Sequence, residues 1–167
     1  MTDVLVLCGG KGTRLKGVTG EAPKALAPVA GRPFLDFLLE YLKGQGLADH
    51  LEKVEAGHKI RVGEIEITFL HTPGHTPGSQ CFLVDNRLVS GDTLFIGACG
   101  RCDLPGGNAA QMYESLQQLA KLDESTLLMP GHNYADTPTS TIGDEKKTNP
   151  YYQIRSLSDF LGLRMGY

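Results

Sequence analysis

The chain has 167 residues, of which 41% are hydrophobic and 21% charged, with a formal net charge of −3. This balance is typical of a folded globular protein rather than a disordered one, and the length suits one domain or one domain with an appendage. Acidic and basic residues are interspersed, unlike the charge runs of nucleic-acid-binding arms or basic membrane patches, so we expect no nucleic-acid and no membrane partner.

The cellular compartment is suggested by three features. The apolar runs are too short to span a bilayer. The N-terminus carries Asp3 where a secretory signal carries positive charge, and a glycine-rich loop follows in place of an apolar signal segment. The chain has only four cysteines, which do not make a disulfide framework. Together these features predict a cytoplasmic protein.

The first 47 residues predict a strand, a loop and a helix. The short apolar run 4–7 suits a buried strand and leads into a glycine-rich loop. Pro33 suits the first turn of a helix over 34–43, and the glycines at 44 and 46 suit its end. The helix has an apolar stripe on one face, formed by Phe34, Phe37, Leu38, Tyr41 and Leu42.

The character of the chain changes after Gly46. Ile65, Ile67 and Phe69 alternate with polar residues, as expected of a half-buried strand. A strand pair is predicted at 81–84 and 88–89, joined by a turn at Asp85-Asn86.

Further along, Asn108 suits the cap of an amphipathic helix over 109–121, whose apolar positions are Met112, Leu116, Leu119 and Ala120. A short strand at 126–129 and a helix at 152–163 follow. The fold class is therefore α/β, with a mixed sheet from residues 54–130 and flanking helices at 34–43 and 109–121.

Three polar residues stand in loops that directly follow predicted strands: His75, Asp92 and His132. Side chains at the ends of adjacent strands can converge on one edge of a sheet. Imidazole nitrogen and carboxylate oxygen are ligands that suit zinc, non-haem iron or manganese. Neighbouring glycines let the backbone turn sharply there, at positions 74, 78, 91 and 131. The pattern predicts a metal site.

The segments EIEITFLHTPGHTPGSQCFLV, RLVSGDTLF and LMPGHNY resemble the metallo-β-lactamase superfamily, in particular its glyoxalase II and persulfide dioxygenase branch. GACGRCDLPGG and TSTIGDEKKTNPYY strengthen that resemblance. The similarity covers about residues 52–153 and implies that residues 48–167 form half of the family's αββα sandwich. A half-sandwich leaves apolar surface open, which favours self-association.

The resemblance also implies roles for individual residues. His75 would complete the first metal site and His132 the second, while Asp92 would bridge two metals or bind a lone iron and so be the catalytic carboxylate. Arg101 and Asp103 would lie near the pocket for a small thiol or thioester substrate. The implied activity is metal-dependent, either thioester hydrolysis or persulfide oxidation, with one or two zinc or iron ions.

Other candidate ligands are weaker. The family places its ligand at the second histidine of HTPGH, so His71 is expected not to bind metal, and His58 is expected to be exposed. Cys99 and Cys102 form a CxxC without a second pair, which favours two structural thiols over a metal or redox pair.

The first half of the family's site, an HxHxDH motif, is missing from this sequence. The nearest string is QGLADH, whose Asp49-His50 we interpret as a coincidence. A hydrolytic zinc needs about three protein ligands and an open position for water. With half of the ligands absent, we expect weak metal binding and impaired activity.

Residues 1–47 carry a second resemblance, to the start of sugar-phosphate nucleotidyltransferases. The loop Gly9, Gly10, Lys11, Gly12, Thr13 and Arg14 follows a strand, as a phosphate cradle should, and Lys24 lies in the APKAL segment. Backbone N–H groups of such a loop bind phosphate oxygens, and the cations neutralise them. Magnesium would be needed only for this activity. The alternative is that the unit now serves only as a strand and a helix.

The chain thus joins the start of one family to the end of another near residues 47–52, through a natural fusion, a laboratory chimera or an assembly error. Three hypotheses follow: an impaired metal-dependent hydrolase, a nucleotide-binding remnant, and a folded hybrid without catalysis. They differ in what they predict for metal content, nucleoside triphosphate binding and turnover.

Overall fold

The computed structural model describes residues 28–45 and 57–166. The chain divides into two compact units, Met1–Val54 and Glu55–Tyr167, and each is considered by itself. The strand predicted at 4–7 and the whole glycine-rich loop lie outside the described residues.

The first unit contains a short hairpin and the predicted helix. Strands β1 (Pro28–Val29) and β2 (Arg32–Pro33) pair antiparallel around a turn, and α2 (Phe34–Gly44) starts immediately afterwards. The helix has the bounds that its apolar stripe predicts. None of its residues is buried, and Phe34 and Tyr41 are largely exposed.

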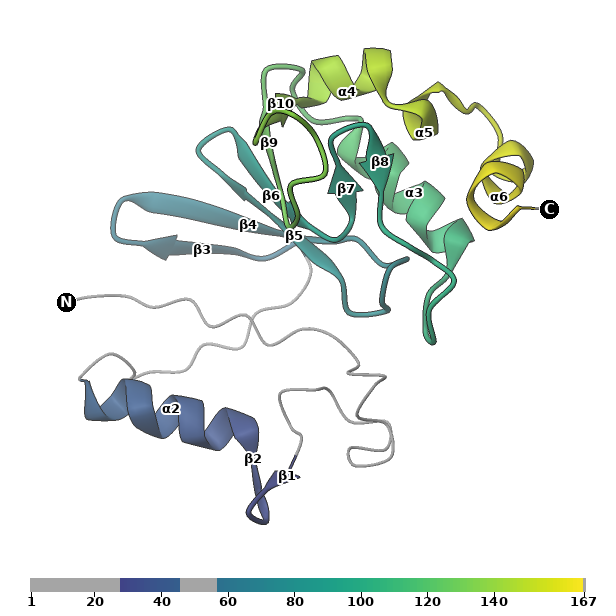
Figure 1. Ribbon diagram of the computed structural model, residues 1–167. Helices are drawn as coiled ribbons and strands as arrows, with labels where there is room; N and C mark the ends of the chain where they lie inside the picture. Colours follow the sequence, from purple (N-terminus) through teal and green to yellow (C-terminus); the bar gives the residue numbers. More distant parts are fainter. Residues whose placement is uncertain (1–27, 46–56, 167) are drawn as a thin grey trace. The chain divides into compact units, whose positions relative to one another are not determined.

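The second unit is built on a six-stranded sheet with the order β10-β9-β6-β5-β4-β3 (Figure 1). β6 pairs parallel with β9, and the other neighbours pair antiparallel, so the sheet is mixed and the predicted α/β class is confirmed. The strands are β3 (Lys59–Val62), β4 (Ile65–His71), β5 (Gln80–Val84), β6 (Arg87–Gly91), β9 (Leu127–Pro130) and β10 (Ser140–Thr141).

Two of these strands are missing from the sequence prediction. β3 is a short, largely exposed strand with charged residues at alternate positions, so it carries too little apolar signal to stand out from a turn. β10 has only two residues. The predicted turn between β5 and β6 is confirmed, since Asp85 and Asn86 both have positive φ, as the tightest hairpin turns require.

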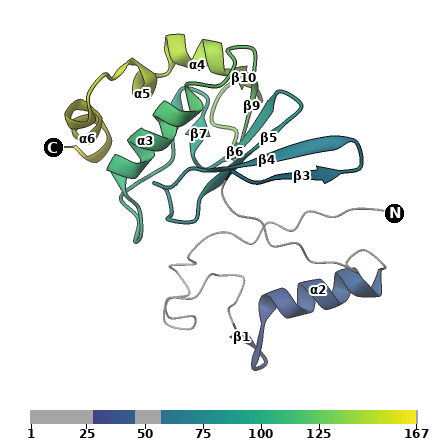
Figure 2. The same ribbon diagram turned by 180° about the vertical axis from the view of Figure 1, so that it is seen from behind.

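Helices α3 to α6 gather on one side of this sheet, whereas the β3–β4 hairpin projects away from them in both views (Figures 1 and 2). Asn108 caps α3 as predicted, since its Oδ1 accepts from the Gln111 N–H. The helices are α3 (Ala109–Leu119), α4 (Ile142–Thr148), α5 (Pro150–Gln153) and α6 (Leu157–Met165). A short hairpin links the sheet to α3. Its two strands, β7 (Leu94–Phe95) and β8 (Ala98–Cys99), have two residues each and pair antiparallel.

The single C-terminal helix predicted at 152–163 is wrong. Ile154 is extended, which ends α5, and Ser156 caps a separate helix α6 by accepting from the Asp159 N–H. α4 was not predicted, although Thr141 caps it in the same manner. Both caps are visible in the sequence as a hydroxyl three residues before an aspartate, a pattern typical of a helix start.

The core lies between the sheet and the helices. Leu88 and Leu128 from the sheet meet Met112 and Leu116 from α3, and Phe160 from α6 is fully buried with them. The alternation predicted for β4 is confirmed at its centre, where Ile67 and Phe69 are buried, but Ile65 at the hairpin end is 44% exposed.

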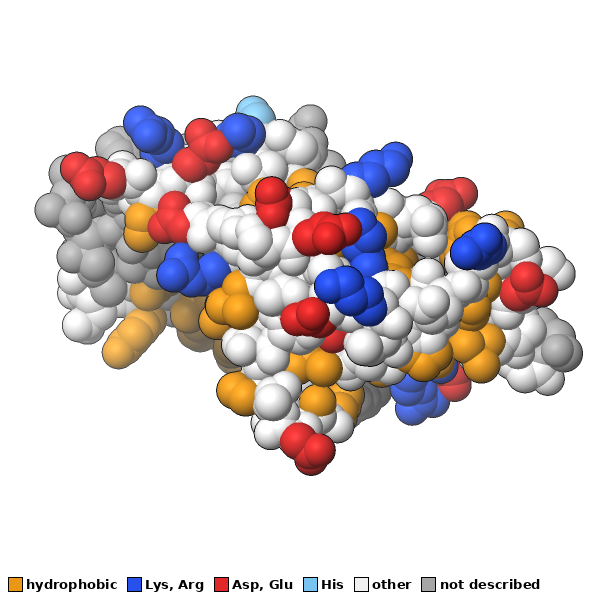
Figure 3. Space-filling view, turned by 90° about the horizontal axis from the view of Figure 1, so that it is seen from above, with side chains coloured by type: hydrophobic (Ala, Val, Ile, Leu, Met, Phe, Trp, Pro, Cys, Tyr) orange, Lys and Arg blue, Asp and Glu red, His pale blue; other side chains and the backbone are white. Residues whose placement is uncertain are grey.

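The face over α4 and α5 carries acidic and basic side chains mixed together, with hydrophobic side chains showing between them (Figure 3). Lys146 of α4 forms an ion pair with Glu124 at 2.7 Å. Exposed pairs of this kind contribute little to stability. None of the helices within the described ranges is long and apolar enough to cross a membrane.

A buried amide ties the β7–β8 hairpin to the helices. Asn149 is fully buried, and its Nδ2 donates to the carbonyls of Phe95 and Ala98 and to Glu145 Oε2, at 3.3, 3.1 and 2.9 Å. Glu145 Oε2 also accepts from the Gly97 N–H at 2.8 Å. The carboxylate and the amide thus hold the segment that directly follows Asp92.

We expect Asn149→Leu to lower the free energy of unfolding by about 3 kcal/mol, because it leaves buried acceptors without their donor. Urea denaturation followed by circular dichroism measures the change. Gln118→Leu, at an exposed position of α3, is the control and should change stability by less than about 0.5 kcal/mol. An equal, small effect at both positions would contradict the role of this amide.

Candidate metal centre

The topology explains why three distant residues meet. β5 lies antiparallel between β4 and β6, and β6 is parallel to β9, so β4, β6 and β9 run in the same direction. Their C-terminal ends therefore share one edge of the sheet. His75 lies in the loop after β4, Asp92 directly follows β6, and His132 follows β9. The structure brings together the three residues that the sequence singled out.

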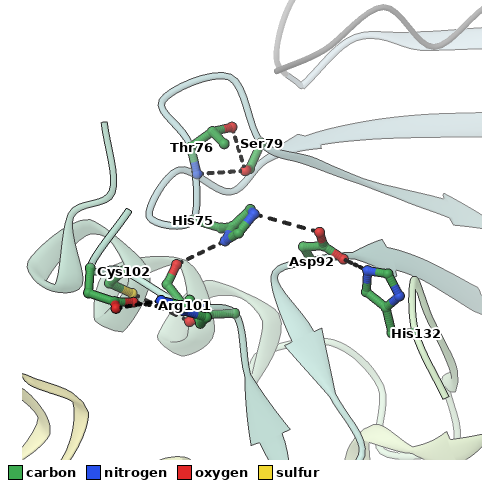
Figure 4. Close-up of polar contacts among 9 residues, drawn as sticks. His75, Thr76, Ser79, Asp92, Arg101, Cys102 and His132 are labelled. Carbon is green, nitrogen blue, oxygen red and sulfur yellow. Dashed lines mark hydrogen bonds and ion pairs between the residues drawn. The ribbon is translucent and has the colours of Figure 1, made fainter. Parts of the chain in front are cut away.

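Asp92 lies between the two histidines (Figure 4). His75 Nε2 is 3.6 Å from Asp92 Oδ2, and His132 Nε2 is 3.3 Å from Asp92 Oδ1. The side chains are 20% exposed for His75, 38% for Asp92 and 55% for His132. The carboxylate thus offers one oxygen to each imidazole, at a site that solvent can reach.

The orientation of His75 suits a metal ligand. Its Nδ1 lies 2.9 Å from the Arg101 carbonyl oxygen, which can only accept, so Nδ1 carries the proton. A neutral ring then turns the lone pair of Nε2 toward Asp92 Oδ2, and two acceptors face each other. A shared cation makes that contact attractive, and a backbone carbonyl on the other ring nitrogen is the usual partner of a metal-binding histidine.

Two glycines allow the close packing around Asp92. A Cβ on Gly100 would lie 1.9 Å from the Asp92 carbonyl oxygen and 3.2 Å from the Cβ of His75. A Cβ on Gly131 would lie 2.9 Å from Asp92 Oδ1. A side chain at Gly131 would crowd the Asp92 carboxylate, and one at Gly100 would clash with the Asp92 backbone. The sequence pattern predicts a role for Gly131 but gives no signal at Gly100, because Gly100 does not directly precede a candidate ligand.

The donors are divided into two pairs rather than gathered in one cluster. Within residues 28–45 and 57–166, no three His, Cys, Asp or Glu side chains converge in the way that one metal ion requires. Instead, each imidazole lies near a different oxygen of the Asp92 carboxylate. Imidazole nitrogen and carboxylate oxygen fit zinc or iron chemically, yet each pair supplies only two of the three or four protein ligands that such ions usually have.

His132 is surrounded by aromatic rings. Its imidazole stacks on Tyr134, with ring centroids 5.4 Å apart, and tilts against Phe95 at 6.0 Å. Phe95 is buried and Tyr134 is 71% exposed. The imidazole of His132 therefore packs against a buried ring on one side and a solvent-exposed ring on the other. Sequence reasoning missed both aromatic residues, although each stands within three residues of a predicted ligand.

A buried hydroxyl network lies beneath the site. Thr72 Oγ1 is 3.0 Å from Thr93 Oγ1 and 3.3 Å from Cys81 Sγ. Thr72 and Thr93 are fully buried and stand close in sequence to His75 and Asp92, respectively. The network therefore ties the backbone that leads to one candidate ligand to the backbone that follows the other.

The proposed substrate residues form an exposed ion pair. Arg101 Nε donates to Asp103 Oδ1 at 3.0 Å and its Nη2 donates to Oδ2 at 2.8 Å. These hydrogen bonds lower the pKa of Asp103 to about 2. The carbonyl of Arg101 contacts His75, so the loop that would contact a substrate also orients a candidate ligand.

The remaining candidates lie apart from this centre or outside the described residues. His71 Nε2 donates to the Pro77 carbonyl at 2.8 Å, and His58 is exposed as expected. Asp49 and His50 lie outside the described residues. So do all the nucleotide-binding candidates of the first unit: Gly9, Gly10, Gly12, Thr13, Arg14 and Lys24.

The thiols of the CxxC segment are buried and protonated. Burial raises the pKa of Cys99 to about 12 and also raises that of Cys102, and burial likewise raises the pKa of Cys81 to about 11. Because the thiolate is the reactive form, the raised pKa values favour two structural thiols over a redox pair.

At pH 8, Cys81 and Cys99 should react with iodoacetamide at least about a hundredfold more slowly in the native protein than in urea, since the thiolate fraction falls tenfold per unit of raised pKa. Peptide mass spectrometry of alkylated samples reads each site. Rapid labelling of Cys99 before unfolding would show that the segment is open and reactive.

Imidazole and carboxylate groups thus meet at one edge of a mixed sheet, an arrangement whose side chains suit a metal ion. A family model for the metallo-beta-lactamase superfamily matches residues 16–132, and the chain belongs to that superfamily. The match begins inside the segment predicted to resemble nucleotidyltransferases. The comparisons lend that second resemblance no support, and it stays a prediction.

Individual relatives agree with this assignment. The chain is 33% identical over 116 residues to the probable polyketide biosynthesis zinc-dependent hydrolase BaeB of Bacillus velezensis, which covers 69% of this chain and 52% of BaeB. The crystal structure of ETHE1 from Myxococcus xanthus aligns with a TM-score of 0.67 and 32% identity, over 84% of this chain and 64% of that one. TTHA1623 in a di-iron-bound form aligns with a TM-score of 0.53 and 29% identity, over 83% and 82%.

The chain spans about half of the length of the curated relatives that it matches, or less. The superfamily assignment therefore applies to the fold of the matched segment.

Proposed function

We propose that this chain is a metal-dependent hydrolase of the metallo-β-lactamase type whose site is built from His75, Asp92 and His132. The observation that carries the proposal is the carboxylate of Asp92 placed between two imidazole nitrogens at 3.6 and 3.3 Å. Zinc-dependent relatives and a di-iron-bound structural neighbour support zinc or iron as the metal.

The residues around the site would have different roles in binding the metal. Asp92 is the central ligand because its two oxygens serve both histidines, and Arg101 fixes the ring of His75 through its carbonyl. Phe95 and Tyr134 limit the movement of His132. A bound zinc or iron ion would supply Lewis acidity and acidify a bound water. The residues of the chain would hold that ion and leave the solvent-exposed side open to a substrate.

We infer a small thiol-derived substrate, either a thioester or a persulfide. Support comes from the likeness to ETHE1 and from the position of Arg101, which is exposed and lies next to the loop that orients His75. Its guanidinium is paired with Asp103, so an anionic group on the substrate would compete with that carboxylate for the same donors.

We propose further that the activity is impaired. Each imidazole–carboxylate pair supplies two ligands, and the HxHxDH motif that would add the others is missing from the sequence. Metal should therefore bind weakly, and turnover should fall well below about 1 s⁻¹, the lower end for ordinary enzymes.

The test is an assay of the zinc-loaded and iron-loaded chain with a small thioester and, under oxygen, a small thiol persulfide. We expect slow turnover of one class that a chelator stops and that His132→Gln removes, while His71→Gln leaves it unchanged. Turnover that survives the chelator, or no turnover of either class, would overturn the proposed activity.

A further inference from the structure

The C-terminal helix reaches the loop that orients His75. Arg164 lies in the last turn of α6, and its Nε donates to the Gly100 carbonyl at 3.1 Å. The next carbonyl along the chain, that of Arg101, accepts from His75 Nδ1 at 2.9 Å. Two consecutive carbonyls of one loop are thus engaged, the first by α6 and the second by the candidate ligand.

The Gly100 carbonyl has few other hydrogen-bond donors nearby. Gly100 is buried, and its N–H donates to the Thr93 carbonyl at 3.1 Å. The other donor near its carbonyl is the Cys102 thiol at 3.5 Å, and a thiol is a weak donor. Because a buried carbonyl without a strong partner is costly, loss of the Arg164 donor would favour a rotated peptide. Such a rotation changes φ of Arg101, the residue whose own carbonyl accepts from His75, and we expect it to disturb that hydrogen bond.

The position of Arg164 is itself fixed. Phe160 is fully buried and packs against Tyr113 and Tyr151, which anchors α6 to the rest of the second unit. The guanidinium of Arg164 lies 5.9 Å from the ring centre of Tyr151. The region matched by the family model ends at residue 132, so Arg164 lies beyond the segment that defines the superfamily.

We propose that Arg164 is a positioning residue of the metal centre, which holds the Gly100–Arg101 peptide so that His75 keeps its proton on Nδ1 and turns Nε2 toward Asp92. This inference rests on the proposed metal-binding function. It assigns to α6 a role in the site although α6 supplies none of the three candidate ligands.

The experiment compares two variants of equal reach. In Arg164→Gln the amide nitrogen occupies the place of the arginine Nε, so the donor is kept and the charge is lost. In Arg164→Met the side chain has the same length and no donor. Arg155→Ala, at an exposed arginine before α6, controls for the loss of positive charge.

The first readout is the tautomer of His75 in the metal-free protein. Imidazole ¹⁵N shifts are recorded at a pH of about 8.5, well above the usual histidine pKa of about 6.5. The His75 signal is assigned by its loss in His75→Gln. We expect an Nδ1–H ring in the wild type, in Arg164→Gln and in Arg155→Ala, and a mixture of tautomers in Arg164→Met.

The second readout is zinc affinity, measured by competition with a chromogenic chelator. We expect Arg164→Met to weaken binding by about tenfold, the lower end for loss of a group that orients a ligand, and Arg164→Gln to change it by less than about threefold. An unchanged tautomer in Arg164→Met, or the same loss in Arg164→Gln, would overturn the inference.

A measurement on the wild type covers the case in which Arg164→Met does not fold. A scalar coupling across the hydrogen bond from Arg164 Nε to the Gly100 carbonyl carbon should be detectable, with slow exchange of the Nε proton. Its absence with fast exchange would overturn the inference. If the tautomer shifts as expected but the wild type binds no zinc, the proposed function fails while the positioning role of Arg164 stands.

Discussion

Asp92→Ala is expected to weaken zinc binding at least about a hundredfold, because the loss of a ligand costs more than the loss of a group that merely orients one. Asp92 contributes an oxygen to each of the two imidazoles, so one substitution removes half of both donor pairs. Competition with a chromogenic chelator measures the affinity, and His71→Gln, whose ring donates to a backbone carbonyl, is the matched control.

The same substitution should leave the fold intact, since Asp92 is partly exposed and lies at the edge of the sheet. Circular dichroism checks this. If Asp92→Ala binds zinc as tightly as the wild type, the carboxylate is not a ligand and the site has been placed wrongly.

Gly100→Ala is expected to be among the most damaging single substitutions in the second unit. The added Cβ would meet the Asp92 carbonyl oxygen at 1.9 Å, and this is backbone that cannot swing aside. Relief of the clash requires the loop to move, which breaks the contacts of Gly100 with Thr93 and Arg164. We expect a loss of about 3 kcal/mol or more in the free energy of unfolding, as for other severe overpacking.

Gly97→Ala separates the clash from ordinary glycine strain. Gly97 lies nearby in the turn between β7 and β8 with φ of +68°, and a Cβ there would meet nothing within 4 Å. Only the left-handed conformation is penalised, at about 1–2 kcal/mol. Urea titrations of both variants give the comparison. Equal destabilisation by the two substitutions would show that the clash between a Cβ at Gly100 and the Asp92 carbonyl does not affect stability.

Local patterns in the sequence were sufficient to find the candidate site. Segments with strand-like patterns precede His75, Asp92 and His132, and a glycine or proline stands between each segment and its polar residue. That pattern places the three residues after strands, and it holds in the structure because β4, β6 and β9 run in one direction. The resemblance to the superfamily rests on the same segments, and the family match confirms it.

The connections that hold the site are long-range, and local patterns cannot reveal them. Asn149 donates to carbonyls more than fifty positions earlier in the chain, and Arg164 reaches Gly100 across 64 positions. Neither residue has neighbours that distinguish it from an ordinary cap or an ordinary surface cation. The break between α5 and α6 was missed for a different reason, because the signal of the Ser156 cap was present but overlooked.

The division of donors into two pairs could not be predicted from residue types alone. By residue type alone, His75, Asp92 and His132 could equally have surrounded one ion. The resemblance to the superfamily implies two metals bridged by Asp92, and in the structure the two histidines approach different oxygens of that carboxylate. This arrangement agrees with the proposed half of a two-metal site, and it is the physical reason why we expect metal to bind weakly.

The central claim is that His75 and His132 bind the metal, and a zinc titration of the ¹⁵N-histidine-labelled protein tests it most directly. The chain has five histidines, so each imidazole can be assigned and followed. We predict that the Nε2 signals of His75 and His132 move on binding, while those of His58 and His71 stay in place. Movement of His58 or His71 with unchanged signals of His75 and His132, or no change at millimolar zinc, would contradict the account.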